Sequence, residues 1–267
     1  MRLWMLGSGS RGNAVLLESA GSRVLVDAGF PVRVLAERLR AISVPPESVE
    51  AVVITHEHTD HVRGACAAAK RWGWSIHATT GTVAAFPALA EADVRRFESG
   101  ATLELSEISL TSIPTPHDAA DPVAFVATER ATGFRAGIAY DIGHITPALR
   151  TALSRLDVLV LEANHDEGML RAGPYPPSVR ERIAGSHGHL SNRAAATLAA
   201  ERAHAGLTHL VLAHLSDSCN DPALAVRTLR TALGRTRFRG EVVAAPQDGV
   251  VGAFGGAGRT ELQLSLF

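Results

Sequence analysis

The segment that most constrains the fold is a buried-strand pattern followed at once by a run of metal-binding side chains. Val52–Ile54 is apolar and β-branched, and three histidines and one aspartate lie within the next seven residues. Residues two apart in an extended segment point the same way, so His56 and His58 can bind one metal ion. Asp60 and His61 lie where the chain turns into a helix and can face a second ion. Imidazole and carboxylate ligands suit Zn, Mn or Fe.

Strand and helix patterns alternate along the rest of the chain, and this alternation predicts the fold class. β-branched runs predict strands at Arg2–Leu6, Val15–Glu18, Arg23–Val26, Ala51–Ile54, Ser75–Ala78, Ile108–Ile113, Val123–Thr128, Arg135–Tyr140, Val158–Leu161, Leu210–Ala213, Val242–Ala245 and Val250–Phe254. Helical patterns cover Val32–Ile42, Val62–Trp72, Pro147–Leu156, Ser178–Ala184, Ser191–Ala205 and Pro222–Leu233. We expect an α/β protein in which two mixed sheets pack together with helices outside.

The positions of linker-type residues along the chain predict one domain with a short tail. No Pro/Ser-rich linker divides the sequence before residue 252, whereas a glycine-rich stretch follows it. We therefore expect a catalytic domain over residues 1–252 and a flexible C-terminal tail over residues 253–267. Neither a membrane span nor a signal peptide is expected, since no apolar run approaches the roughly 18 residues that a span needs. Cys66 and Cys219 stand in no metal-binding spacing and are expected to be reduced thiols of a cytoplasmic protein.

The metal-binding run also carries a family resemblance. His-x-His-x-Asp-His after an apolar strand resembles the signature of the metallo-β-lactamase superfamily, and the resemblance extends from residue 2 to about residue 252. It implies an αββα sandwich with the site at one edge, between the sheets. It implies that one ion takes His56, His58, His117 and Asp141, and that the other takes Asp60, His61, Asp141 and His214. It also implies that Asp27 orients the metal-binding loop. Activity as a true β-lactamase is not expected.

Five further segments resemble one branch of that superfamily, the YycJ/WalJ-type metallo-hydrolases. These segments are Gly7–Asn13, His117–Pro122, Leu161–Asp166, Gly188–Asn192 and Leu212–Ser216. The branch is similar to tRNA-processing and phosphonate-pathway phosphodiesterases and is associated with DNA exonuclease activity. The resemblance therefore implies a two-metal phosphodiesterase acting on nucleic acid, most simply a DNA exonuclease of 5′–3′ polarity in replication or repair. The net charge of −1 argues mildly against a protein that holds nucleic acid by counterion release.

Several residues are candidates for catalysis or substrate binding. Asp60 is expected to orient the attacking water as well as to bind metal. His189 lies just before a helix, where related phosphodiesterases keep a histidine that contacts phosphate or protonates the leaving oxygen; alternatively it only begins the helix. His165 either faces the site or satisfies a local turn. In the glycine-rich loop from Ser8 to Asn13, backbone N–H groups could hold phosphate, or the loop is simply a tight turn.

Charged side chains gather around the His189 segment. Its neighbours Arg171, Arg180, Arg182 and Arg193 could attract a polyanion, and a solvated charged face is the alternative.

The last five residues of the chain resemble the peptide by which bacterial polymerases and repair proteins bind the sliding clamp. Leu264, Leu266 and Phe267 would fill an apolar pocket, and Gln263 would make directed hydrogen bonds. A flexible tether would let the catalytic domain reach DNA. Alternating leucines are also typical of an edge strand, so completion of a sheet is the competing interpretation.

Two other function classes stay open from the sequence. One is a thioester or lactone hydrolase of the glyoxalase-II type, because the same metal loop serves such relatives. The other is a non-catalytic, clamp-associated regulatory module that kept the fold. The choice among Mn, Zn and Fe, between DNA and RNA, of strand polarity and of oligomeric state is not decided by the residues.

Overall fold

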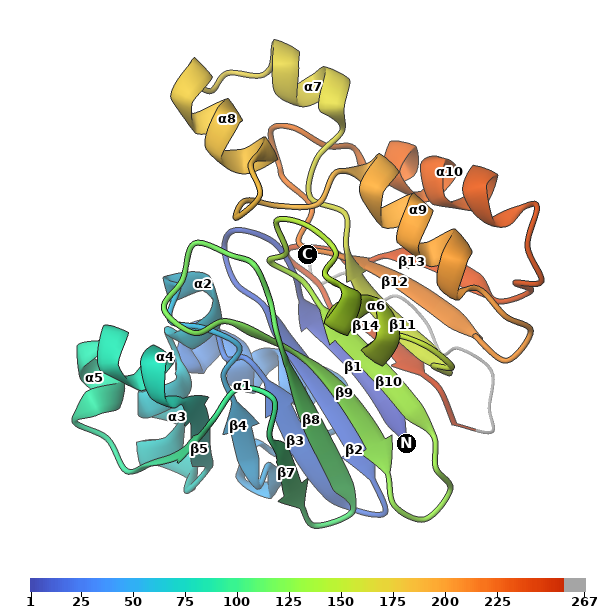
Figure 1. Cartoon of the computed structure of the whole chain (residues 1–267). Coiled ribbons are helices and arrows are strands. Elements are labelled where there is room, and N and C mark those ends of the chain that lie inside the picture. Colours follow the sequence, from blue (N-terminus) through green and yellow to red (C-terminus); the bar gives the residue numbers. More distant parts are fainter. Residues whose placement is uncertain (257–267) are drawn as a thin grey trace.

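The computed structural model, which describes residues 1–256, is a four-layer αββα sandwich (Figure 1). The first sheet runs β14-β1-β2-β3-β4-β5-β6 and the second runs β13-β12-β11-β10-β9-β8-β7. Strands of the first sheet are β1 (Arg2–Gly7), β2 (Ala14–Ser19), β3 (Ser22–Val26), β4 (Ala51–Val53), β5 (Ser75–Thr79), β6 (Val94–Phe97) and β14 (Val251–Phe254). Strands of the second are β7 (Thr102–Leu105), β8 (Ile108–Pro114), β9 (Val123–Glu129), β10 (Arg135–Ala139), β11 (Val158–Glu162), β12 (His209–Ala213) and β13 (Glu241–Ala244). The expected class of two mixed sheets with outer helices is confirmed.

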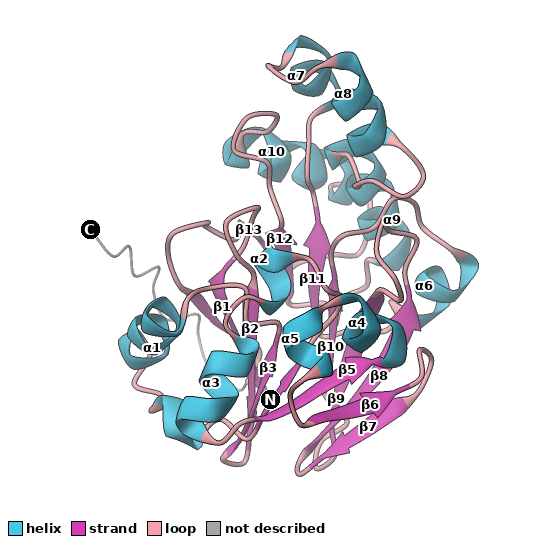
Figure 2. Cartoon of the chain, turned by 90° about the vertical axis from the view of Figure 1, so that its left-hand side faces the viewer, coloured by secondary structure: helices cyan, strands magenta, loops and turns pink. Residues whose placement is uncertain are grey.

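Helices cover the outer face of each sheet. Those that follow strands of the first sheet are α1 (Val32–Ala41), α2 (Thr59–Val62), α3 (Ala65–Trp72), α4 (Thr80–Ala85) and α5 (Pro87–Ala90), with a 3₁₀ turn at Pro46–Ser48. Those of the second half are α6 (Pro147–Ala152), α7 (Glu167–Ala172), α8 (Pro177–Ala184), α9 (Asn192–Arg202) and α10 (Pro222–Leu233). In Figure 2 the helices α1 to α5 face the viewer, and α7 and α8 stand above the body of the molecule. No helix within residues 1–256 is long and apolar enough to span a bilayer.

Strand alternation explains why the molecule has three apolar interfaces. Inward-facing residues of both sheets, such as Met5 and Phe125, form one buried cluster between the sheets. The opposite faces of the same strands bury a second cluster against α1, which includes Leu35, and a third against α9 and α10, which includes Leu198 and Leu229. Because both faces of each sheet are covered, the central strands are apolar throughout rather than alternating.

The direction of the strands places their carboxyl ends at one edge of the sandwich. β3, β4, β5 and β6 are parallel in the first sheet, and β10, β11, β12 and β13 are parallel in the second. Loops that follow parallel strands in an open sheet meet at the carboxyl edge, where ligands bind in such folds. The metal-binding run follows β4 and therefore lies at this edge.

Three expectations about the elements need correction. One helix was expected over Val62–Trp72, but α2 ends and α3 begins around Gly64, whose amide donates to the carbonyl of Ala28 (2.7 Å). The edge strands β6 and β7 were not anticipated, because an exposed edge needs few apolar residues. The strand predicted over Val250–Phe254 is present as β14, which pairs with β1 and ends in the fully buried Phe254, so the sheet extends two residues into the segment that was expected to be the tail.

Candidate metal centre

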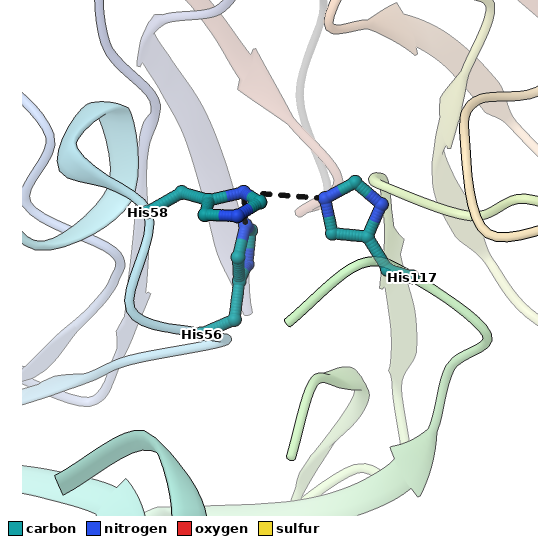
Figure 3. A group of neighbouring side chains, drawn as sticks. All are labelled: His56, His58 and His117. Carbon is teal, nitrogen blue, oxygen red and sulfur yellow. Dashed lines mark hydrogen bonds between the residues drawn. The ribbon is translucent and has the colours of Figure 1, made fainter. Parts of the chain in front are cut away.

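Three histidines that lie far apart in sequence bring their ring nitrogens together (Figure 3). His56 and His58 come from the loop after β4, and His117 comes from the loop between β8 and β9. His56 Nε2 lies 3.0 Å from His58 Nδ1, which in turn lies 3.3 Å from His117 Nε2. Nitrogens bound to one ion at about 2.0–2.1 Å are separated by a similar distance. The three rings therefore fit a shared metal ion.

A second group lies beside the first and consists of Asp60, His61 and His214. Asp60 Oδ2 is 3.3 Å from His61 Nε2 and 3.2 Å from His214 Nε2. The donor atoms of this group are close enough together to share one ion. Asp60 and His61 lie in α2, the short helix that ends the metal-binding run, and His214 follows β12 of the other sheet. The centre is therefore built from both sheets.

Asp141 stands between the two groups and links them. Its Oδ2 lies 2.8 Å from His61 Nε2, and its Oδ1 lies 3.3 Å from His214 Nδ1 and 4.0 Å from His117 Nε2. Oδ2 is buried and, within residues 1–256, makes no hydrogen bond of acceptable geometry. A buried carboxylate oxygen that meets its neighbouring ring, His61, outside hydrogen-bond geometry is poorly satisfied, and a bound cation would satisfy it. The donor set and the unsatisfied oxygen therefore both fit divalent metal ions.

Asp27 organises the metal-binding loop, in the place where the sequence predicted a supporting aspartate. It accepts hydrogen bonds from the Thr55 amide and hydroxyl (both 2.8 Å), from the Tyr140 hydroxyl (2.7 Å) and from His61 Nδ1 (2.7 Å). Because Nδ1 of His61 is engaged, its Nε2 is left to face Asp141. Carboxylates behind ligating histidines fix the ring orientation in this way in metal sites.

Ser8 and Asn13 support the same loop from the turn after β1. The Ser8 hydroxyl donates to Asn13 Oδ1 (2.9 Å) and accepts from the His214 amide (2.8 Å). The amide of Asn13 donates to the carbonyl of Asp60 (2.8 Å), and its side-chain Nδ2 lies 3.3 Å from Asp60 Oδ2. The amide of Gly9 is also used, since it donates to Asn13 Oδ1 (3.0 Å). These contacts favour the tight-turn interpretation over a phosphate-binding loop.

His189 reaches the centre from the segment before α9. Its Nδ1 lies 2.7 Å from Glu162 Oε1 and 3.2 Å from Asp141 Oδ1, and its ring stacks on that of His214 with centroids 5.2 Å apart. Its side chain is 20% exposed, and the ring lines the cavity at the centre. With Nδ1 engaged by carboxylates, Nε2 is the nitrogen left for a substrate.

Glu162, the last residue of β11, lies at the centre although the sequence analysis gave it no role. Fully buried, it accepts from the amides of Ile142 (2.8 Å) and Leu190 (3.1 Å) as well as facing His189. Its carboxylate also lies near enough to Asp141 and His214 to count as a metal ligand. Since both of its oxygens are already satisfied, we regard it as a support for His189. The available signal was an acidic residue ending an otherwise apolar strand.

The carboxylates set the charge state of the rings around them. Burial lowers the pKa of His61, yet Asp60, Asp141 and Asp27 raise it well above its ordinary value. For His214, Asp141 and the other carboxylates outweigh burial and raise the pKa to about 9. His189 likewise keeps a strongly raised pKa, because Glu162 and Asp141 outweigh burial.

The other set of rings behaves differently. Burial and neighbouring rings hold the pKa of His56 well below the usual value. The pKa of His117 is lowered by burial as well. Without metal, the carboxylates thus favour the protonated form of His61 and His214, whereas burial favours the neutral form of His56 and His117.

His165 is not among the residues that the structure brings together at the metal groups. Its ring is buried, and within the described part of the chain Nδ1 has no hydrogen-bond partner. It lines a neighbouring cavity of about 570 Å³, whereas the metal centre opens into a cavity of about 380 Å³ that His58, Asp60 and His214 line. His189 lines both cavities.

Two curated relatives resemble this chain along most of their length. Exodeoxyribonuclease WalJ of Streptococcus pneumoniae is 31% identical over 237 residues, which cover 86% of this chain and 87% of that protein. Exodeoxyribonuclease YycJ of Bacillus anthracis is 29% identical over 240 residues, which cover 88% of this chain and 89% of that protein.

Family and structural comparisons agree with each other. Residues 7–167 match the family described as the Metallo-beta-lactamase superfamily. The metallo-beta-lactamase fold protein YhfI from Bacillus subtilis superposes with a TM-score of 0.70 at 20% identity, covering 94% of this chain and 99% of that one. The αββα architecture is therefore shared with solved proteins of that fold.

Proposed function

Because the chain belongs to the metallo-beta-lactamase superfamily of metal-dependent hydrolases, we propose that it is a metal-dependent nuclease that removes nucleotides from the ends of DNA strands. Similarity to two proteins named exodeoxyribonucleases over most of their length supports this substrate class. The observation that carries the proposal is the convergence of two metal-binding groups with His189 on one cavity. A phosphodiesterase needs cationic charge for the phosphate and a proton donor for the leaving oxygen, and both would be present here.

The residues that would hold the ions are those of the two groups. One ion would take His56, His58, His117 and Asp141, and the other would take Asp60, His61, Asp141 and His214. When bound, two divalent ions neutralise charge on the phosphate and make a water easier to deprotonate. Mixed imidazole and carboxylate donors suit Zn, Mn and Fe.

The protein's own side chains then have distinct tasks. Asp60, whose pKa is held well below its ordinary value by His61 and His214 in spite of burial, orients the attacking water. Glu162 and Asp141 outweigh burial and raise the pKa of His189, which favours the form that can donate a proton. Its Nε2 would donate that proton to the oxygen that leaves as the P–O bond breaks. Glu162 fixes the orientation of His189 by accepting a hydrogen bond from its Nδ1 (2.7 Å). Asp27 and Asn13 keep the loop in place around these groups.

A panel of substrates tests the reaction class. Bis-p-nitrophenyl phosphate represents phosphodiesters, S-lactoylglutathione represents thioesters and a homoserine lactone represents lactones. We expect hydrolysis of the phosphodiester and degradation of DNA, both lost in Asp60→Ala. Hydrolysis of the thioester or lactone with bis-p-nitrophenyl phosphate untouched would establish the competing enzyme class. Full cellular function in a variant without metal ligands would instead support a regulatory module.

We also propose the 5′–3′ polarity, a role in replication or repair in the cytoplasm, and clamp binding by the C-terminal residues. The residues concerned, Gln263, Leu264, Leu266 and Phe267, lie outside the described residues, so the proposal rests on their sequence alone. The test is co-purification of the full chain with a bacterial sliding clamp. Replacement of Leu266 and Phe267 by alanine is expected to abolish it, and equal binding by this variant would remove the proposal.

A further inference from the structure

A second cavity adjoins the metal centre and has no role in the reaction described above. It lies between the α7–α8 pair and the beginning of α9, and its volume is about 570 Å³. Pockets of roughly 300–1,000 Å³ hold small molecules the size of a nucleotide. The ring of His189 is a wall common to this cavity and the metal centre. A strand whose scissile phosphate lies at the metals therefore needs to pass only this ring to enter the second cavity.

The lining combines cationic, polar and apolar surfaces. Leu170, Pro177 and Leu190 supply apolar contact, while Arg171 on α7 and Arg180 on α8 supply positive charge. Within residues 1–256 neither arginine forms an ion pair, although Arg180 donates a hydrogen bond to the carbonyl of Arg171. A guanidinium group without a carboxylate partner is available to bind phosphate in bidentate fashion.

Three other charged side chains, Glu167, Glu181 and Arg193, line the cavity. Arg193 is paired with Glu167 (2.8 Å), so these two charges offset each other. Glu181 also lines the cavity and opposes an anion. Arg171 and Arg180 thus leave a net positive rim against the single unpaired glutamate. A phosphate group is an anion that such a rim can bind.

Buried polar groups indicate that the cavity is built to take a ligand. His165 is 2% exposed and lines it, and its Nδ1 has no hydrogen-bond partner in the described part of the chain. At the same wall α9 begins with Ser191, whose hydroxyl accepts from the Ala194 amide (3.2 Å). The N-terminus of this helix adds a positive partial charge. An unsatisfied buried histidine nitrogen is rare in proteins and needs an explanation, which a polar ligand or an ordered water would supply.

We propose that this cavity receives the terminal nucleotide of the substrate strand and that Arg171 and Arg180 bind its end phosphate. The inference rests on the proposed nuclease function and adds a specificity to it. A strand end that carries a phosphate is processed faster than one that carries a hydroxyl. The apolar wall contacts the base, and His189, which lines both cavities, lies between this nucleotide and the scissile bond.

The experiment compares internally labelled single-stranded oligonucleotides that differ only at one end. Each 5′ and 3′ end is prepared with phosphate and with hydroxyl, and kcat/KM is measured with the metal-loaded full chain. Wild type is expected to prefer phosphate at one end by about tenfold, which is the size of one charge-assisted hydrogen bond. The Arg171→Gln/Arg180→Gln pair is expected to reduce that ratio to about one. Arg227→Gln, an exposed arginine on α10, is the matched control and should keep the tenfold ratio.

Two results of this experiment would overturn the inference. Absence of any end preference in wild type overturns it, and so does an unchanged ratio in the Arg171→Gln/Arg180→Gln pair. The Arg171→Lys/Arg180→Lys pair keeps both charges and should retain part of the preference.

Failure of the nuclease function itself is recognised separately. If wild type degrades no DNA but hydrolyses bis-p-nitrophenyl phosphate, the cavity is tested by inhibition of that hydrolysis with thymidine 5′-monophosphate and thymidine 3′-monophosphate. At least one of these nucleotides should inhibit the Arg171→Gln/Arg180→Gln pair about tenfold more weakly than wild type. Equal inhibition of both proteins by each nucleotide overturns the proposed site.

Discussion

Three residues of the centre share an unusual backbone conformation. Asp27, Asp141 and His214 each follow a strand and have φ values of 63°, 55° and 54°. Non-glycine residues rarely adopt this left-handed region, which costs roughly 1–3 kcal/mol and is tolerated mainly at functional sites. The turn reverses the chain immediately after the strand and directs the side chain across the carboxyl edge. Hydrogen bonds such as that from the His214 amide to Ser8 offset the strain.

Glu162 offers the sharpest test at the residue scale. Glu162→Gln removes a charge that, together with Asp141, raises the pKa of His189 in spite of burial. We expect kcat for bis-p-nitrophenyl phosphate to fall about 10–100-fold, as for other residues that support a catalytic ring. In the native protein the carboxylates raise the pKa of His189. Loss of the Glu162 charge lowers this pKa, so the alkaline limb of the pH profile moves to lower pH. Rates from pH 5 to 10 measure this shift, with the exposed Glu104→Gln as control. An unchanged limb would contradict the role of Glu162.

Metal affinity should depend on pH through the same electrostatics. Neighbouring carboxylates raise the pKa of His61 well above its ordinary value and that of His214 to about 9, so protons compete with a metal ion for both rings in the metal-free protein. An ion must displace these protons, and affinity therefore rises as pH increases. Between pH 6 and 8 we expect the dissociation constant at this set to fall at least about tenfold per unit. The neutral His56 and His117 set provides an internal comparison with weaker dependence. Titration against a chromophoric chelator measures both, and a flat response at both sets is the contrary result.

At the scale of elements, three loops pack against one another through their backbones. The amide of Gly29 donates to the carbonyl of Asn13 (2.9 Å), and the amide of Ala28 donates to that of His61 (2.8 Å). A Cβ added at Gly29 would lie 1.7 Å from the carbonyl oxygen of Asp60. Glycine is required there because the turn after β3 touches the metal-binding loop directly.

Gly29→Ala should therefore separate these loops. We expect a loss of about 1–3 kcal/mol in the free energy of unfolding, together with weaker metal binding. Gly234→Ala is the control, since a Cβ there meets its nearest atom at 3.5 Å and the residue has an ordinary φ of −58°. Urea unfolding with and without metal gives both quantities. If Gly29→Ala kept the wild-type free energy of unfolding and the wild-type affinity for metal, the loops would be shown to tolerate separation.

The elements also show where prediction from sequence succeeded and where it did not. Strands such as β11 and β12 were predictable because they are buried on both faces and apolar throughout. Edge strands β6 and β7 were missed, since exposed arginines and glutamates interrupt their pattern. His56 to His61 could be assigned from spacing alone, whereas His117, Asp141 and His214 needed the family resemblance. The role of Glu162 depends on contacts that only the folded chain creates.

At the scale of the whole molecule, the centre ties the two halves together. His56, His58, Asp60 and His61 follow the first sheet, whereas Asp141 and His214 follow the second. Bound ions would therefore act as links between the sheets and stabilise the folded state by mass action. Each bound ion contributes about 2.7 kcal/mol to the free energy of unfolding when the free ion concentration is about 100 times the dissociation constant of its site.

Removal of the ions should consequently lower the melting temperature. We expect a chelator that removes both ions to reduce Tm by about 10–20 °C for a chain of this size. Asp141→Ala, which removes a ligand common to both proposed sets, should show a smaller difference between metal-loaded and chelated samples. Differential scanning calorimetry measures the effect. A wild-type Tm that is the same with and without chelator would mean that metal does not link the sheets.

We propose that this centre cuts DNA from its ends. Mn-dependent degradation of end-labelled DNA is the direct test of that activity. Single- and double-stranded substrates labelled at either end are incubated with wild type and with Asp60→Ala, and the size of the first labelled product is followed over time. We predict that wild type releases labelled mononucleotides from one end and that Asp60→Ala loses at least about 10³-fold in rate. Intact DNA with every metal tested, in a protein shown to hold two ions, would contradict the account and point to a small ester or phosphodiester as substrate.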